Sequence, residues 1–306
     1  MEVDRMTLED FAEDLDHRGF SKVARDNTVW AVKRYLKWAS LEGIDPQKGR
    51  KEDVLSYLAY LRAKGLKRAT LANNFTALSN WFEFLVESGE LEINPIPPLK
   101  KRYLQAYKDE IHQRQIITVE QATKMVRATI DTRDRAILLL LLKTGIRRNE
   151  LVTLDLEDVD MPGQKITLKP TGKRSNRIVF FDHEAARSLT RWISVRETRY
   201  KKRGENALFI SMLGTRLKRE AINRLVREAA ERVGLYDSSS KKLEDKFSPH
   251  CCRHFLTTQL LRNNMRREYV QWLRGDSIKQ AVDIYFHINP EDVKQSYLAC
   301  VPELGV

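Results

Sequence analysis

The sequence has few cysteines and no long apolar run. Only three of its 306 residues are cysteines, too few for a disulfide framework and typical of a reducing cytoplasm. The longest apolar run, Ala136–Leu142, is far shorter than the ~20 residues that a membrane-spanning helix needs. The start, MEVDRMTLEDF, is acidic and lacks the basic-then-apolar order of a signal peptide. We therefore expect a soluble, cytoplasmic protein.

The motifs of a metal site and of a nucleotide site are also missing. Cys251 and Cys252 are adjacent in PHCCRHF (249–255), and no second CxxC or HxxxH supplies further zinc ligands. We expect both cysteines to pack as small apolar side chains. There is no phosphate-binding GxxxxGK[ST] loop. The sequence therefore predicts neither a metal nor another cofactor.

Positive charge is concentrated in one part of the chain. The net charge is +12 and the pI is about 9.5. Residues 1–95 carry 14 Lys/Arg against 16 Asp/Glu, whereas residues 96–306 carry 40 against 26. Such an excess is the electrostatic pattern of a polyanion binder, although solvated helix faces would produce it too.

The composition and the apolar spacing predict two domains. Residues 1–95 show helical spacing throughout, with Gly43, Gly65 and Gly89 where helix ends are expected. The prolines and basic residues of NPIPPLKKRY predict an extended basic linker, which we place at 96–115. Residues 116–306 are predicted to be mainly helical.

Three local features are predicted within residues 116–306. Thr118 and Gln121 form a capping-box pattern at the start of a helix. The segment 131–154 reads as an apolar helix, a turn at Gly145 and a second helix. ITL and RIVFF in 166–181 are strand-like and flank a polar stretch, which predicts a β-hairpin.

Four boxes in this half resemble the tyrosine recombinase family, the phage-type integrases and Xer-type recombinases. TGIRRNEL (144–151) is similar to the family's TGLRxxEL, with Arg147 at the first catalytic arginine and Glu150 as an acidic neighbour. PHCCRHFLTT resembles HxLRHTxxT, which places His250 and Arg253 in the site. Taken singly, each residue could equally be an ordinary surface or core residue.

The other two boxes complete the set. The hairpin TGKRSNRIVFF (171–181) resembles the one that delivers the family's catalytic lysine; we favour Lys173 over Lys169. LRGDSIKQAVDIYFH (273–287) resembles LLGHSxxxTTxxYTH and places the nucleophile at Tyr285. Here Asp276 replaces the usual His or Trp, so one hydrogen-bond donor to the phosphate is missing. We expect Asp276 to hold Arg253 or His250 instead.

The resemblance implies metal-free and ATP-independent cutting of DNA. The two arginines would clamp the phosphate bidentately, His250 would exchange protons around it, and the lysine would protonate the leaving 5′ oxygen. Tyr285 would form a 3′-phosphotyrosine. DNA contacts are also expected from the basic residues of the hairpin and the linker: Lys169, Arg174, Lys100, Lys101 and Arg102.

The implied fold is a SAM-like helical core-binding domain followed by an α-rich catalytic domain with a small antiparallel sheet. The implied function is site-specific DNA recombination by a tetramer on two double-stranded attachment sites. The end of the chain, 289–306, is expected to pack on a neighbouring subunit. The segment from WLRGDS to VPELG looks most like archaeal integrases of viruses and plasmids. Two alternatives are a type IB topoisomerase-like activity and a DNA-binding accessory protein without catalysis.

Overall fold

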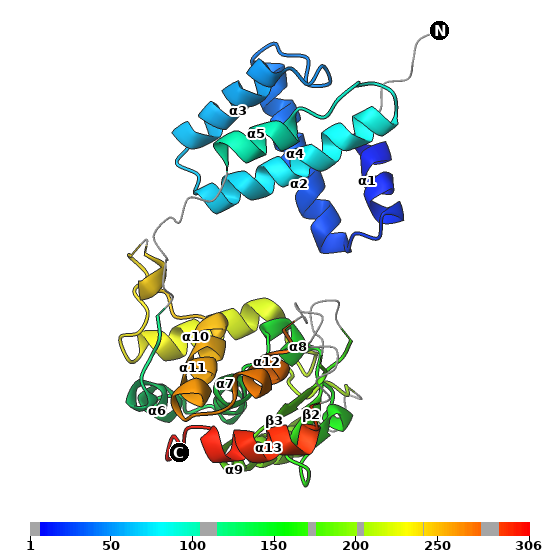
Figure 1. Cartoon of the computed structure of the whole chain (residues 1–306). Coiled ribbons are helices and arrows are strands. Elements are labelled where there is room, and N and C mark those ends of the chain that lie inside the picture. Colours follow the sequence, from blue (N-terminus) through cyan, green and yellow to red (C-terminus); the bar gives the residue numbers. More distant parts are fainter. Residues whose placement is uncertain (1–6, 105–114, 171–175, 201–204, 241, 277–287) are drawn as a thin grey trace. The chain divides into compact units, whose positions relative to one another are not determined.

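The computed structural model describes residues 7–104, 115–170, 176–200, 205–240, 242–276 and 288–306. The chain divides into two compact units, Met1–Ile111 and His112–Val306. The described residues form thirteen α-helices and a three-stranded antiparallel sheet, which confirms the predicted fold class (Figure 1). No helix among them is long and apolar enough to cross a membrane.

The first unit is entirely helical in its described residues. Its helices are α1 (Leu8–His17), α2 (Lys22–Leu41), α3 (Lys51–Ala63), α4 (Arg68–Glu87) and α5 (Ile96–Tyr103). Gly43, Gly65 and Gly89 follow α2, α3 and α4 with positive φ, as the sequence predicted. Its core is rich in aromatic rings. The rings of Tyr35 and Tyr57, for example, pack edge to face with 5.1 Å between their centres.

Helix α5 corrects the prediction of an extended linker. The two prolines of this helix lie in its first turn, where backbone N–H groups have no partner within the helix, so they do not break it. The Ile96 N–H instead donates to Asn94 Oδ1 at 3.0 Å. Ile96 and Leu99 are buried in the core of the first unit. Residues 96–103 therefore belong to that unit.

The second unit contains all the strands of the sheet. Its elements are α6 (Val119–Arg127), α7 (Thr132–Thr144), α8 (Arg148–Val152), β1 (Val159–Asp160), β2 (Lys165–Thr167), β3 (Ile178–Phe180), α9 (His183–Tyr200), α10 (Arg219–Glu231), α11 (Pro249–Arg262), α12 (Arg267–Arg274) and α13 (Pro290–Cys300), with 3₁₀ turns at Leu156–Asp158 and Leu243–Asp245. The Thr118–Gln121 capping box is present as predicted, with bonds of 2.9 and 3.2 Å.

Helix α7 is the centre of the second unit. Every residue from Ala136 to Thr144 is buried, because α6, α9, α10 and α11 pack around this helix. Such all-round burial is typical of a helix that is hydrophobic on every face. Its C-terminal end, at Gly145, is thereby fixed against α11.

The sheet has the order β1-β2-β3 and contains the predicted hairpin. Ile166 pairs with Val179 across β2 and β3. The Leu168 N–H donates to the Arg177 carbonyl and closes the hairpin beyond the strands. At the start of β3, the Asn176 side chain donates to the Trp272 carbonyl of α12. The hairpin is thus tied to the helix that precedes Asp276.

The end of the chain packs within its own unit, which corrects the prediction that 289–306 packs on a neighbouring subunit. Val293 and Tyr297 of α13 are buried against Leu256, Leu260 and the other residues of one core cluster. The Tyr297 hydroxyl donates to the Lys143 carbonyl at 2.8 Å. This helix therefore completes the core of the second unit.

Candidate active site

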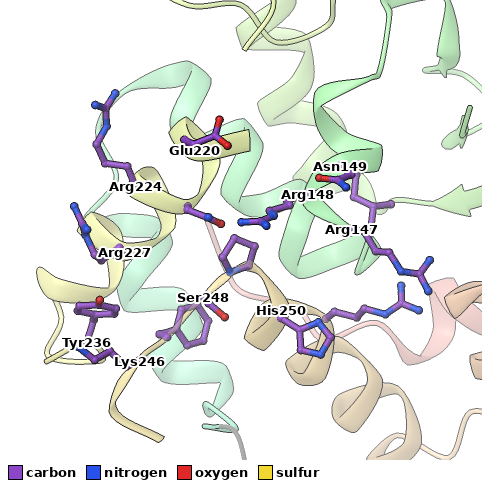
Figure 2. Close-up of a pocket in the computed structure, with 15 residues that line it drawn as sticks. Arg147, Arg148, Asn149, Glu220, Arg224, Arg227, Tyr236, Lys246, Ser248 and His250 are labelled. Atoms are coloured by element: carbon purple, nitrogen blue, oxygen red, sulfur yellow. The ribbon is translucent and has the colours of Figure 1, made fainter. Parts of the chain in front are cut away.

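A basic pocket opens on the second unit between α8, α10 and the start of α11 (Figure 2). Its volume is about 720 Å³. In Figure 2, Arg224 and Arg227 lie on one side of it, and Arg147 and His250 on the other. The charged residues that line it are Arg147, Arg148, Glu220, Arg224, Arg227, Lys246 and Arg253, together with His250. One carboxylate against six cationic side chains suits a polyanion.

Arg147 stands at the N-cap of α8. Its backbone N–H donates to Glu150 Oε2 at 2.7 Å, and its Nη1 donates to Glu150 Oε1 at 2.9 Å. Glu150 is buried, whereas the Arg147 side chain keeps a third of its surface exposed. The carboxylate therefore holds one edge of the guanidinium and leaves another open to the pocket.

Arg253 is nearly buried on α11 and is held by backbone carbonyls. Its Nη1 donates to the Gly145 carbonyl at 2.8 Å, and its Nη2 donates to the Arg274 carbonyl at 2.5 Å. Gly145 has φ +59°, and a Cβ there would lie 3.2 Å from Leu256 Cδ2. Glycine thus permits the close approach of α7 and α11 that delivers this carbonyl.

His250 lies one turn before Arg253 on α11 and also lines the pocket. It is exposed, and its ring packs edge to face on His254, with 4.7 Å between the ring centres. Cys251 and Cys252 are buried on the other side of this helix turn, in the main core cluster. Burial raises the pKa of the Cys252 thiol, so it stays protonated. No cluster of metal-binding side chains occurs among the described residues.

Asp276 does not line the pocket but lies beside Arg253. Its Oδ1 is 3.6 Å from Arg253 Nη2, an ion pair rather than a hydrogen bond. Its Oδ2 accepts from Arg274 Nε at 2.7 Å. The structure thus brings together Arg147, His250, Arg253 and Asp276 from α8, α11 and the turn after α12.

The remaining predicted residues fall into two groups. Lys173, Arg174 and Tyr285 lie outside the described residues. Lys169 forms ion pairs with Asp155 at 2.8 Å and Asp158 at 3.2 Å, and none of these three residues lines the pocket. These carboxylates raise the Lys169 pKa, which disfavours the loss of its proton.

The three basic residues expected in the linker lie on α5 of the first unit. Lys100 Nζ donates to Thr76 Oγ1 at 2.9 Å. The Arg102 guanidinium lies over the Tyr103 ring at 5.6 Å, and Lys101 is exposed. They are therefore surface cations of a helix and do not form an extended strand.

Sequence reasoning missed four cationic residues of the pocket: Arg148, Arg224, Arg227 and Lys246. Arg224 and Arg227 are three residues apart on α10, so they share its polar face. That amphipathic spacing was readable in REAINRLVREAAE, but nothing local showed which way the polar face would point.

Two other late tyrosines can be assessed as nucleophiles. Tyr297 is buried, and burial raises the pKa of its hydroxyl, which already donates to a carbonyl. Tyr269 packs under the Arg266 guanidinium on α12. Neither residue lines the pocket.

Comparison with known protein families identifies the class of this chain. The model described as the phage integrase family matches residues 109–292, and the one described as the phage integrase N-terminal SAM-like domain matches residues 8–89. The chain therefore belongs to the phage integrase family, the tyrosine recombinases, which are site-specific DNA recombinases.

Individual relatives cover most of the chain. It is 31% identical to tyrosine recombinase XerC of Haemophilus influenzae over 244 residues, which covers 78% of this chain and 77% of the relative. It is 27% identical to tyrosine recombinase XerC of Thermodesulfovibrio yellowstonii, which covers 92% and 93%.

Two solved structures share the fold. One is the Tn1549 transposon integrase in complex with transposon right end DNA, with a TM-score of 0.67, 18% identity and coverage of 95% of this chain and 98% of that one. The other is a lambda integrase dimer bound to a core site, with a TM-score of 0.65, 17% identity and coverage of 92% and 97%.

Proposed function

We propose that this recombinase cuts and rejoins duplex DNA at specific attachment sites through a 3′-phosphotyrosine on Tyr285. The observation that carries the proposal is the convergence of Arg147, His250 and Arg253, from distant parts of the sequence, around one basic pocket. Asp276 lies against Arg253. Tyr285 follows Asp276 by nine residues. That spacing is the one found in the resembled box.

The reaction needs charge neutralisation, a nucleophile and an acid. The Tyr285 hydroxyl gives its proton to His250 as its oxygen attacks the phosphorus, and the bond from phosphorus to the 5′ oxygen breaks. The two arginines neutralise the pentavalent intermediate, since guanidinium forks match two phosphate oxygens. The free 5′ oxygen takes a proton from the acid. In the second half, a 5′-hydroxyl from another strand attacks the phosphotyrosine, so no ATP is required.

We infer that the acid is Lys173. Lys169 is engaged by two carboxylates that hold its proton. The hairpin that contains Lys173 is anchored by Asn176, three residues further along the chain, which donates to the Trp272 carbonyl of α12. Helix α12 also provides the Arg274 carbonyl that holds Arg253. These contacts tie the start of β3, on the loop side of the hairpin, to the element beside the phosphate clamp.

Three wider features are part of the proposal. Two attachment sites would be joined by four copies of the chain, as exchange between two duplexes requires four strand cuts. Arg174, Lys101 and Arg102 would contact DNA outside the pocket. The segment from WLRGDS to VPELG supports an origin in an archaeal virus or plasmid, with action on DNA in the cytoplasm.

The first test traps the covalent intermediate. A pool of nicked duplex fragments from the element that encodes the chain is incubated with the wild type, Tyr285→Phe and Tyr269→Phe. Cleavage at the nicked strand releases a short product, so re-ligation cannot occur. We expect a DNA-linked protein band on a denaturing gel for the wild type and for Tyr269→Phe, and none for Tyr285→Phe. A band that survives in Tyr285→Phe would exclude this residue as the nucleophile.

The same fragments separate the two alternative activities. Joining of two differently labelled fragments shows strand exchange, whereas relaxation of a supercoiled plasmid without joining indicates a topoisomerase-like activity. The other alternative is an accessory protein that only binds DNA, and the presence of Asp276 in place of a phosphate-site donor favours it. Fragments that bind tightly but form no covalent band would support that reading.

A further inference from the structure

The turn after α12 carries two charged residues where the resembled box has neutral ones. In LRGDS, Arg274 and Asp276 flank Gly275, whereas the resembled pattern LLGHS has leucine and histidine there. Arg274 Nε donates to Asp276 Oδ2 at 2.7 Å. Arg274 Nη1 lies 3.5 Å from Thr257 Oγ1 on α11, one turn after Arg253. The two side chains therefore form an ion pair that is anchored to the helix of the phosphate clamp.

The same two residues hold the Arg253 guanidinium. Its Nη2 donates to the Arg274 carbonyl at 2.5 Å and lies 3.6 Å from Asp276 Oδ1. The Arg253 side chain is 7% exposed, whereas those of Arg274 and Asp276 are 35% and 36% exposed. The Arg253 guanidinium is thus held by the Arg274 carbonyl and the Asp276 carboxylate, which belong to one turn.

A carboxylate at this place raises an electrostatic problem. An ionised Asp276 can only accept hydrogen bonds, and its negative charge repels the phosphate that Arg253 would bind. A nearby cation removes most of that repulsion, since opposite charges at contact distance largely cancel at longer range. Arg274 is placed to do so, with its Nε on one carboxylate oxygen while Arg253 faces the other.

We propose that Arg274 is a positioning residue for the recombination reaction. With Asp276 it forms a charge-neutral pair that takes the place of the neutral donor and holds Arg253 in its phosphate-binding orientation. Loss of Arg274 alone removes the cation that is hydrogen-bonded to the carboxylate beside the clamp. Replacement of both residues restores a neutral site. The inference rests on the proposed function, because it assumes that Arg253 contacts the scissile phosphate.

A double-mutant cycle tests the pair. The variants are Arg274→Leu, Asp276→His and the double variant, with Arg267→Leu two turns earlier on α12 as a control for the loss of one positive charge. Cleavage of the nicked fragment is measured in single turnovers at saturating DNA. We expect Arg274→Leu to be roughly 100-fold slower, Asp276→His roughly 10-fold slower, and the double variant within about fivefold of the wild type. Arg274→Lys, which keeps the charge, should recover part of the rate.

Thermal unfolding separates positioning from folding, because the rate losses should occur with a Tm within about 2 °C of the wild type. The pair has no such role if Arg274→Leu cleaves within twofold of the wild-type rate. It also has none if the fold decrease in rate of the double variant equals the product of the fold decreases of the two single variants.

A second measurement keeps this question apart from the proposed function. The same variants are made with Tyr285→Phe, and their affinity for the fragment is measured without cleavage. We expect Arg274→Leu to bind about tenfold more weakly and the double variant to recover. If the wild type forms no covalent band on any fragment, the proposed function fails, but the affinity measurements still test the role of Arg274. Equal DNA affinities with and without Arg274→Leu would overturn that role.

Discussion

At the scale of single residues, the site is defined by how its arginines are held. Arg147 is oriented by the buried Glu150, which uses both carboxylate oxygens. Two nitrogens of Arg253 donate to backbone carbonyls, one of Gly145 after α7 and one of Arg274 in α12. A guanidinium has five N–H donors in a fixed plane, so it can make these contacts and still bind a phosphate. A lysine ammonium has three donors and no such plane.

Arg253→Lys is therefore expected to be a severe change. The cleavage rate at saturating DNA should fall about 10²- to 10³-fold, while the affinity for DNA changes little because the charge is kept. Arg262→Lys, at the exposed end of the same helix, is the control and should cleave at the wild-type rate. Single-turnover kinetics and a binding titration measure the two effects. If Arg253→Lys were as active as the control, Arg253 would not bind the phosphate bidentately.

At the scale of elements, a buried charge cluster joins α7, α9 and the end of the chain. Lys143 Nζ is fully buried and donates to Asp182 at 2.6 Å, to Glu184 at 2.5 Å and to the Pro302 carbonyl at 2.5 Å. Glu184 also accepts from the backbone N–H groups of Leu304 and Val306 at 2.8 and 2.9 Å. Buried charges are tolerated only when they are paired in this way.

This cluster predicts a loss of stability in acid. Burial alone would raise the pKa of Glu184, but Lys143 and the two backbone N–H groups outweigh it and lower the pKa to about 2. Because the folded pKa lies below the unfolded value of 4.5, the stabilisation is complete above about pH 5. It is lost as the pH falls toward 2, and it amounts to about 3 kcal/mol.

Urea unfolding at several pH values checks this. Glu184→Gln should lower the free energy of unfolding at neutral pH and flatten its decrease between pH 5 and 2. Glu197→Gln, at an exposed position of the same helix, should keep the wild-type profile. An unchanged acid profile in Glu184→Gln would mean that another carboxylate is responsible.

At the scale of the whole molecule, charge is divided unevenly along the chain. The positive excess lies in residues 96–306, and the second unit carries the basic pocket with Arg224 and Arg227 on α10. Binding of a polyanion there releases counterions, so the affinity depends steeply on salt. The slope of log affinity against log salt reports the number of phosphate contacts.

Removal of the α10 arginines should therefore flatten the salt dependence. Each phosphate contact contributes about 0.9 to the slope, so Arg224→Ala with Arg227→Ala is expected to reduce it by about 2. Arg191→Ala with Arg199→Ala on α9, which contributes no residue to the pocket, removes the same charge and should leave the slope nearly unchanged. Binding titrations from about 50 to about 300 mM salt measure both. Equal slopes in the two double variants would show that Arg224 and Arg227 do not contact DNA phosphates.

The local features were predictable because they depend on residues within a few positions of one another. The Thr118–Gln121 capping box, the turn at Gly145 and the pairing of ITL with RIVFF all follow from short-range hydrogen bonding and side-chain spacing. The extended linker at 96–115 was wrong over α5, since prolines in a first turn do not oppose a helix and Ile96 and Leu99 have a core to enter.

By itself, the sequence determined the helical periods, the excess of positive charge and the four boxes that indicated a tyrosine recombinase. Only the tertiary structure decided which distant residues meet: Arg253 with the Gly145 carbonyl, Asp276 with Arg253, and Lys143 with the end of the chain. Helix periods and caps depend on local hydrogen bonds, which are written in neighbouring residues. Long-range contacts depend instead on which surfaces pack and which charges are buried together, and those follow from the three-dimensional arrangement of the chain.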